Sequence, residues 1–355
     1  MTVVLLSGDI TRPGGTERMA LSLAGMFYQE LGYHTAVLSL SGAGKEPFYP
    51  IEKGISLFFA PVGGVAKKIL WLRRMLFRLD ADVLIGVDIG TALYTLPGAF
   101  LKKTRVISWE HGNFYNDWGS KWIPFFRRAA RYFGDALVVL TKQDEKTYIQ
   151  NIPHGCPIRC IYNPAPEVPD HLYDIGSRTI LSVGNLIPVK GFDKAVEAAK
   201  MVLESRPGWR WEIWGEGPLL PELQRNVREK GLEGRVVFRG LAREIHMVYD
   251  KSAIMVMTSQ MEGLPLTLLE AKAHKLPIVS FDIMTGPADI LTNGVNGFLV
   301  PAGDTAALAE KIGLLMDNSA LRQRFSDSAR QDIGRFDKKE ILSQWEALIW
   351  EVSGR

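Results

Sequence analysis

Two glutamates in the second half of the chain have a spacing that suits a ligand site. Glu262 and Glu270 are separated by seven residues, and Pro265 lies between them. Proline favours the first turn of a helix, because its missing N–H would have no partner there anyway. We therefore expect Glu262 in a loop and Glu270 about one and a half turns inside a buried, apolar helix. A buried carboxylate needs a partner, and the vicinal hydroxyls of a ribose would supply one.

The backbone between these glutamates adds a site for an anion. The amides of Gly263 and Leu264 lie at the predicted helix N-terminus, where free donors and the helix dipole favour a phosphate. One short segment thus offers a sugar site, a phosphate site and a second carboxylate near a reacting centre. The alternative is a pair of unrelated surface glutamates, which the apolar residues around Glu270 disfavour.

Three further strand-to-helix corners in the second half of the chain carry glycine or charge. Gly184 and Asn185 leave a strand, and Lys190 precedes the next helix, where an ammonium suits a diphosphate as a point charge. Gly215 opens a second corner at 215–218, and residues 285–287 form a third. Each corner alone is compatible with ordinary turns, but together with the glutamate pair they predict one ligand-binding edge.

The first half of the chain has two weaker signals of the same kind. Gly14 and Gly15 open a helix and allow close approach of the backbone to a phosphate or sugar, although a plain tight turn fits equally well. They lack the full glycine spacing of a dinucleotide site. His111 follows a strand and is expected at a carboxyl edge, with a purely structural histidine as the alternative.

The composition is that of an ordinary globular protein with room for two domains. The chain has 355 residues, of which 46% are apolar and 23% charged, and its net charge of +3 gives no reason to expect nucleic acid. It has no run of about eighteen apolar residues, and its first residues lack the basic region of a signal peptide. Because there are only two cysteines, without a second pair for zinc, we expect a cytoplasmic protein.

Short β-branched runs alternate with helical patterns along the whole chain, which predicts an α/β protein with parallel sheets. A proline-rich break near residues 163–177 divides the pattern into an N-terminal domain (1–165), a C-terminal domain (178–335) and a final helix (336–355) expected to pack across the domain junction. Two doubly wound domains facing each other would form a cleft at their carboxyl edges. The predicted strands are residues 3–6, 35–40, 83–87, 105–109, 137–140, 179–183, 209–214, 236–239, 254–258, 277–281 and 298–300.

The corners and the glutamate pair resemble, in order and spacing, the retaining glycosyltransferases of family 4. The resemblance is strongest over residues 178–305, and Gly14, Gly15 and His111 extend it into the first half. It implies the GT-B fold of two facing Rossmann-like domains. The segment from Glu262 to Pro265 is similar to members that build bacterial surface polysaccharides, commonly from UDP-hexoses or UDP-N-acetylhexosamines. The acceptor would be a saccharide, free or linked to a polyprenyl diphosphate.

The resemblance also assigns roles to individual residues. Glu262, His111 and Lys190 would be catalytic, with Glu262 and His111 on the transferred sugar and Lys190 on the diphosphate. Glu270 would bind the ribose. The remaining donor-binding positions would be Gly14, Gly15, Gly184, Asn185, Gly215, Leu241, Arg243, Gly263, Leu264 and Pro265. Many members have arginine where this chain has Asn185, so either Lys190 with the helix N-termini suffices or another cation replaces it.

The expected mechanism is front-face displacement with retention of anomeric configuration. The diphosphate would leave as the acceptor hydroxyl attacks the same face, with Lys190 and helix N-termini stabilising the departing charge. On this interpretation neither a metal nor a cofactor is required. Asp80 and Asp82 imitate a metal-binding Asp-x-Asp signature, but we interpret them as a solvated strand entrance.

Residues 66–79 interleave five cations with apolar side chains in a predicted amphipathic helix. Such a helix can lie on an anionic membrane, here the inner face of the cell membrane, or can simply pack inward with a basic outer face. For the whole protein, the alternatives are a non-catalytic glycosyltransferase-like subunit, a GT-B nucleotide-sugar epimerase and a phosphorylase. Phosphorylase is disfavoured because no lysine has a distinctive pyridoxal-binding context.

Overall fold

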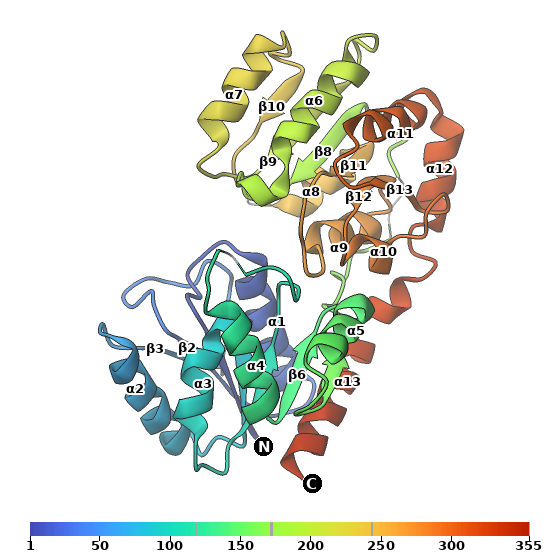
Figure 1. Cartoon of the computed structure of the whole chain (residues 1–355). Helices are drawn as coiled ribbons and strands as arrows, with labels where there is room; N and C mark the ends of the chain where they lie inside the picture. The colour runs from blue at the N-terminus through green and yellow to red at the C-terminus, as the bar shows by residue number, and fades with distance from the viewer. Residues whose placement is uncertain (118, 171–172, 243, 355) are drawn as a thin grey trace. The chain divides into compact units, whose positions relative to one another are not determined.

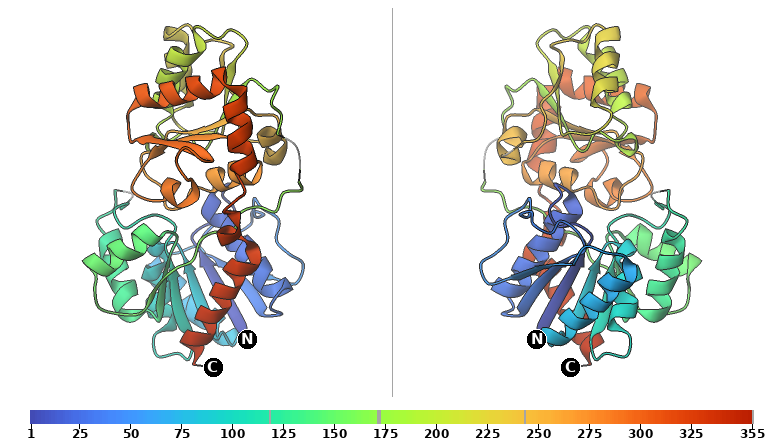
Figure 2. Two further views of the ribbon diagram at one scale, coloured as in Figure 1. Left: turned by 90° about the vertical axis from the view of Figure 1, so that its right-hand side faces the viewer. Right: turned by 90° about the vertical axis from the view of Figure 1, so that its left-hand side faces the viewer.

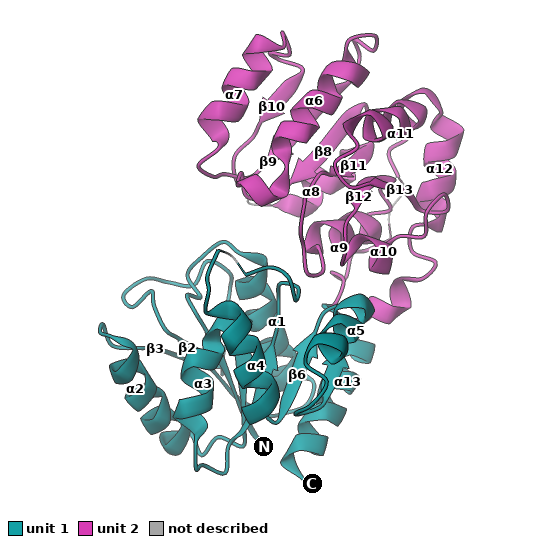
Figure 3. Ribbon diagram, viewed as in Figure 1, with its two compact units in different colours: residues 1–163, 338–355 teal, residues 164–337 magenta. Residues whose placement is uncertain are grey.

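The chain forms two compact units in the computed structural model, which describes residues 1–117, 119–170, 173–242 and 244–354 (Figure 3). Unit 1 comprises Met1–Asn163 together with Lys338–Arg355, and unit 2 comprises Pro164–Asp337. No helix among the described residues is long and apolar enough to cross a membrane.

Unit 1 is built on a sheet of seven parallel strands in the order β3-β2-β1-β4-β5-β6-β7. The five strands predicted in this half are β1, β2, β4, β5 and β6, whereas β3 and β7 were not predicted. β3 is only partly buried and β7 has three residues, so neither has a long apolar run. The strands are β1 (Thr2–Ser7), β2 (His34–Ser39), β3 (Ser56–Phe59), β4 (Val83–Val87), β5 (Arg105–Trp109), β6 (Ala136–Val139) and β7 (Ile158–Cys160).

Helices cover both faces of this sheet. The connection from β1 to β2 contains α1, and the connections from β3 through to β7 contain α2 to α5 and cross the sheet in the opposite direction. Because such crossovers are right-handed, α1 lies on one face of the sheet and α2 to α5 lie on the other. Figure 1 shows α2, α3 and α4 side by side on one face. The helices are α1 (Gly15–Gln29), α2 (Val65–Arg78), η1 (Ile89–Thr91), α3 (Ala92–Ala99), α4 (Ile123–Phe133), α5 (Lys142–Asn151) and α13 (Lys338–Ser353).

The C-terminal helix α13 returns to unit 1 and runs along its sheet (red in Figure 2). Trp345 is buried, with its ring 6.2 Å from that of Phe27 on α1 and 5.2 Å from that of Trp109 on β5. Lys338 pairs with Glu30 at 3.0 Å near the start of the helix. These contacts all lie within unit 1, and the packing of this helix across a domain junction stays a prediction.

Unit 2 has six parallel strands in the order β10-β9-β8-β11-β12-β13, and each was predicted. β8 is followed by β9 and β10 on one side of the sheet, and β11 to β13 lie on the other. The carboxyl ends of β8 and β11 are therefore where the connections diverge, which is the position that binds ligands in open α/β sheets. The strands are β8 (Thr179–Val183), β9 (Arg210–Trp214), β10 (Val236–Phe238), β11 (Ile254–Met257), β12 (Ile278–Asp282) and β13 (Gly297–Pro301).

The helices of unit 2 connect these strands and complete the predicted α/β fold. They are η2 (Pro188–Lys190), α6 (Phe192–Leu203), α7 (Leu220–Glu229), α8 (Ile245–Asp250), α9 (Leu266–Ala273), α10 (Pro287–Ile290), α11 (Thr305–Asp317), α12 (Ser319–Ser328) and η3 (Ile333–Phe336). Four of them, η2, α8, α9 and α10, flank the corners discussed below.

The contacts of Trp345 predict that α13 stabilises unit 1. Trp345→Ala should lower the free energy of unfolding by about 3–5 kcal/mol, because it opens a cavity between α1, β5 and α13. Trp350→Ala on the same helix is the matched control, since Trp350 is 41% exposed and should change stability by less than about 0.5 kcal/mol. Urea unfolding followed by circular dichroism measures both, and equal losses would contradict this packing role.

Candidate functional site

Lys190 and Glu262 meet at the point where the connections of unit 2 diverge. The Lys190 Nζ lies 2.5 Å from Glu262 Oε1, and both side chains are partly buried. The backbones of the two corners are also joined, because the Gln260 amide donates to the Val189 carbonyl at 2.8 Å. Two residues predicted to act on one ligand, 72 positions apart in the sequence, are thus brought together by the fold.

A glycine makes this approach of the two corners feasible. Gly191 follows Lys190 with φ +62°, and an added Cβ there would collide with the carbonyl oxygen of Thr258. The Thr258 hydroxyl donates to the Lys190 carbonyl at 3.1 Å. The position of Lys190 is therefore fixed by its own backbone as well as by the ion pair with Glu262.

The segment from Glu262 to Pro265 leads into α9, as predicted, with Pro265 in the N-cap position. The Thr285 hydroxyl donates to the Glu262 carbonyl at 2.6 Å. Gly286 has φ +101°, and a Cβ there would collide with the Pro265 ring and lie 2.8 Å from the Gly263 carbonyl. The corner after β12 thus backs the segment that carries the predicted anion site at Gly263 and Leu264.

Glu270 lies on α9 and is buried, as the apolar pattern around it predicts. The Tyr249 hydroxyl donates to Glu270 Oε2 at 2.6 Å. The Tyr249 ring stacks on His274, whose Nδ1 is 2.6 Å from Asp250 Oδ1. Tyr249 was not predicted from the sequence. The available signal was an aromatic residue followed directly by charged residues, 21 residues before Glu270.

The remaining corners of unit 2 gather at the same carboxyl edge. The amide of Gly215 donates to the Gly240 carbonyl at 2.8 Å, and a Cβ at Gly215 would collide with the carbonyl oxygen of Gly184. Asn185 is exposed beside them, and Leu241 is 43% exposed just after β10. The predicted donor-binding residue Arg243 lies outside the described residues.

His111 lies at the carboxyl edge of unit 1, as predicted, directly after β5. Its ring is 4.2 Å from the Trp109 ring, and its Nε2 is buried without a hydrogen-bond partner among the residues that the structure describes. Burial lowers the pKa of His111 to about 3. The imidazole is therefore neutral at physiological pH.

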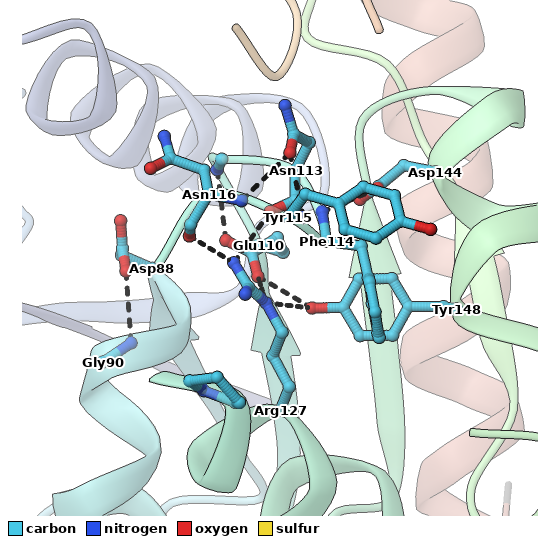
Figure 4. A network of polar contacts seen from close by, with 12 residues as sticks. Asp88, Gly90, Glu110, Asn113, Phe114, Tyr115, Asn116, Arg127, Asp144 and Tyr148 are labelled. Atoms are coloured by element: carbon cyan, nitrogen blue, oxygen red, sulfur yellow. Dashed lines mark hydrogen bonds and ion pairs between the residues drawn. The ribbon is translucent and has the colours of Figure 1, made fainter. Parts of the chain in front are cut away.

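A buried polar network holds the loop that carries His111 (Figure 4). The Arg127 Nε donates to Glu110 Oε2 at 3.0 Å, and the Tyr148 hydroxyl donates to the same oxygen at 2.7 Å. The Arg127 Nη2 also donates to the carbonyls of Asn113 and Asn116, both at 2.7 Å. Burial raises the pKa of Glu110, and the Arg127 guanidinium opposes that shift. None of these partners was predicted.

Two more carboxyls, the buried Glu17 and the partly buried Asp88, lie near the carboxyl edge of the unit 1 sheet. Glu17 is in the first turn of α1, which begins at Gly15, and Gly14 is the N-cap. A Cβ at Gly14 would collide with the Glu17 carboxyl. Asp88 follows β4 with φ +73°, an unusual conformation for a residue with a side chain. Burial raises the pKa of both Glu17 and Asp88, and neither carboxyl was predicted as a site residue.

The structure places Asp80 and Asp82 away from these groups, at the amino end of β4. Asp82 Oδ2 accepts a hydrogen bond from the Thr2 amide at 2.8 Å, which fits the interpretation of a strand entrance. Within the described ranges, no group of three or more His, Cys, Asp or Glu residues is arranged to hold a metal ion.

Comparison with known proteins identifies the fold and shows a family resemblance in unit 2. Residues 169–332 match the model of the family described as glycosyl transferases group 1. An alpha-1,4-N-acetyl-D-galactosaminyltransferase of Campylobacter jejuni is 26% identical over 355 residues, which are 96% of each chain. An exopolysaccharide phosphotransferase of Streptomyces coelicolor is 33% identical over 287 residues, or 80% of this chain, which spans only 30% of that relative.

Among solved structures, HepE of Anabaena, crystallised with UDP and glucose, superimposes with a TM-score of 0.84. The two chains are 17% identical, and the superposition covers 99% of this chain and all of HepE. The fold is therefore GT-B, that of a large class of glycosyltransferases. Within this class, residues 169–332 are similar to the group 1 glycosyl transferases, so the predicted resemblance to such enzymes and the predicted fold are confirmed.

The hydrogen bond from Tyr249 to Glu270 predicts a measurable loss of stability in Tyr249→Phe. A hydrogen bond to a charged group contributes about 1.5–3 kcal/mol, and its removal leaves a buried carboxylate less satisfied. Tyr173→Phe is the matched control, because Tyr173 is also buried in unit 2 but donates to the neutral Ala253 carbonyl at 2.7 Å. Urea unfolding should show the larger loss in Tyr249→Phe, and the reverse order would contradict the assignment.

The network around Glu110 predicts that Arg127→Met is strongly destabilising, by about 3–5 kcal/mol, because it leaves a buried carboxylate without its cation. The double variant Arg127→Met/Glu110→Gln should recover part of this loss. Arg128→Met is the control, since Arg128 is the exposed neighbour on the same helix. Thermal unfolding compares all three, and no recovery in the double variant would argue against the ion pair as the cause.

Proposed function

We propose that this glycosyltransferase retains anomeric configuration and moves a hexose or N-acetylhexosamine from a UDP-sugar to a glycan or lipid-linked saccharide. The synthesis of a cell-surface polysaccharide is the proposed setting. The observation that carries the proposal is the meeting of Lys190 with Glu262 at the divergence point of unit 2, next to the α9 N-terminus.

The names of similar proteins support the donor and the acceptor. HepE was crystallised with UDP and glucose. The Campylobacter relative is named as a transferase that extends a glycan on undecaprenyl diphosphate. Both chains are matched over nearly their whole length, so the comparison favours a nucleotide-sugar donor and a polyprenyl-linked acceptor here.

In the proposed mechanism, Lys190 neutralises the departing diphosphate. A diphosphate oxygen is a stronger competitor for the ammonium than one carboxylate, so donor binding draws Lys190 from Glu262 toward the phosphate. The Gly263 and Leu264 amides add donors from the helix N-terminus. Glu262 then interacts with the transferred sugar as positive charge develops at the anomeric carbon of that sugar. The acceptor hydroxyl attacks the same face, and its proton passes to a leaving phosphate oxygen.

Two other side chains hold the donor in this proposal. Glu270 accepts hydrogen bonds from the ribose hydroxyls, and Tyr249 fixes the orientation of its carboxylate. In unit 1, the neutral His111 contacts a hydroxyl of the transferred sugar, since its buried Nε2 has no partner among the described side chains. Charge neutralisation by Lys190 and by the helix N-terminus makes the mechanism independent of a metal or cofactor.

The assignment of Lys190 predicts a selective loss of turnover in Lys190→Gln. The kcat for UDP release should fall by about tenfold to a hundredfold, corresponding to one charged hydrogen bond of about 1.5–3 kcal/mol. Lys194→Gln is the matched control, because Lys194 lies on the next helix and pairs with Glu197 rather than Glu262. Turnover of Lys190→Gln within a few-fold of the wild type would remove Lys190 from the mechanism.

The same assay separates the alternative functions. A panel of UDP-sugars is incubated with and without polyprenyl-linked acceptor, and both UDP and the product anomer are measured, the latter by NMR. The proposal requires UDP release that depends on acceptor and a product with the donor's configuration. Sugar conversion without UDP release would indicate an epimerase, and binding without turnover would indicate a non-catalytic subunit.

A further inference from the structure

The face of unit 1 covered by α2, α3 and α4 carries exposed aromatic side chains in unusual number. At the N-cap of α4 and along the helix, Trp122, Phe125 and Tyr132 lie on one side at helical spacing and are 66%, 58% and 53% exposed. The opposite face of α4, with Ile123, Arg127 and Ala130, is buried against the unit. This outward row is therefore not needed for packing within unit 1, and large exposed apolar patches mark interaction sites.

The second part of this face is formed by α2 and the loop that follows α3. Leu72, Met75 and Leu76 of α2 are buried in the core, whereas Phe77 and the loop residue Leu101 are 77% and 84% exposed. Arg73 Nη1 donates to the Phe100 carbonyl at 2.6 Å, and Lys102 Nζ lies 4.7 Å from the centre of the Phe77 ring. The loop and α2 thus form one continuous surface.

These exposed apolar groups are surrounded by cations without counter-charges. Segments 65–79, 100–103 and 121–133 contain eleven of the chain's 42 Lys and Arg residues and none of its 39 Asp and Glu residues. All but the buried Arg127 and Arg131 are at least partly exposed. None of these nine cations forms an ion pair with a described carboxylate. They are Lys67, Lys68, Arg73, Arg74, Arg78, Lys102, Lys103, Lys121 and Arg128.

The three segments present their outer sides in one direction. α3 packs against both α2 and α4, and all three helices cover the same face of the sheet (Figure 1). We call this surface the cationic aromatic face and define it by these nine cations together with Leu70, Phe77, Phe100, Leu101, Trp122, Phe125, Tyr132 and Phe133. It combines protruding apolar tips with unneutralised positive charge.

We propose that the cationic aromatic face binds an anionic lipid bilayer. Aromatic and leucine side chains insert at the level of the headgroups, while surrounding Lys and Arg residues attract acidic lipids. A second copy of this chain is a poorer occupant, because a two-fold interface would place nine unpaired cations against the same nine. From the sequence, α2 was predicted either to pack inward or to bind a membrane. It does pack inward, and its outer side forms one part of the cationic aromatic face.

The inference does not depend on the proposed transferase mechanism, and it is tested by sedimentation with vesicles. The full chain is mixed with vesicles of phosphatidylcholine alone or with phosphatidylglycerol added. We expect sedimentation only with the phosphatidylglycerol vesicles. Binding should weaken strongly at about 1 M salt, where the Debye length falls to about 3 Å.

Variants of the face locate the binding. Arg74→Gln/Lys103→Gln/Arg128→Gln should weaken binding by roughly a hundredfold, at about fivefold for each cation near the surface. Trp122→Ser/Phe125→Ser should abolish the part of vesicle binding that remains at high salt. The matched charge control is Arg225→Gln/Arg228→Gln on α7 of unit 2, and the aromatic control is Trp350→Ser on α13. Both controls should bind as the wild type does.

Three results would overturn the proposal. The first is no sedimentation with anionic vesicles at low salt, and the second is vesicle binding that the face variants leave unchanged. The third is a dimer that forms without vesicles, is seen by light scattering, and dissociates in the face variants. The last would make the face an interface between copies. UDP release measured without vesicles should be the same for wild type and face variants, so a failure of the proposed transferase activity is distinguishable from a failure of lipid binding.

Discussion

The ion pair between Lys190 and Glu262 depends on a property of parallel sheets. Consecutive strands deliver their carboxyl ends to the same edge, and the connections of unit 2 diverge between β8 and β11. Two corners far apart in the sequence therefore come together, and each carries one charge. Glycines without room for a Cβ let the backbones approach, as at Gly191 and Gly286. The sheet topology therefore brings the two corners together, and the side chains on those corners then form the ion pair.

Glu110 of unit 1 and Glu262 of unit 2 differ in their burial and in their partners. Glu110 is completely buried and is satisfied by Arg127, Tyr148 and the Gly112 amide. Such an arrangement has little to offer a ligand and serves to fix the loop that carries His111. Glu262, by contrast, remains partly accessible and pairs with Lys190, whose ammonium can also contact a diphosphate.

The sequence predicted the elements whose signals are local. Every strand of unit 2 was predicted because each is an apolar run that ends in glycine, proline or a polar corner, whereas β3 and β7 are too short or too exposed to give such a run. The placement of Lys190 and Glu262 at one edge of the sheet followed from the order of the corners, whereas the ion pair between them was not predicted. Tyr249 and Arg127 were missed, because their partners are chosen by tertiary packing and lie 21 and 17 residues away.

The small net charge of +3 illustrates a further limit of composition. It gives no hint of a strong local field, yet the three segments of the cationic aromatic face hold eleven cations and no anion, so the rest of the chain must carry an excess of acidic residues. A balanced total therefore conceals a separation of charge that only the fold can assemble, since the three segments become neighbours through α3. Local fields of this kind, rather than total charge, decide which surfaces attract a charged partner.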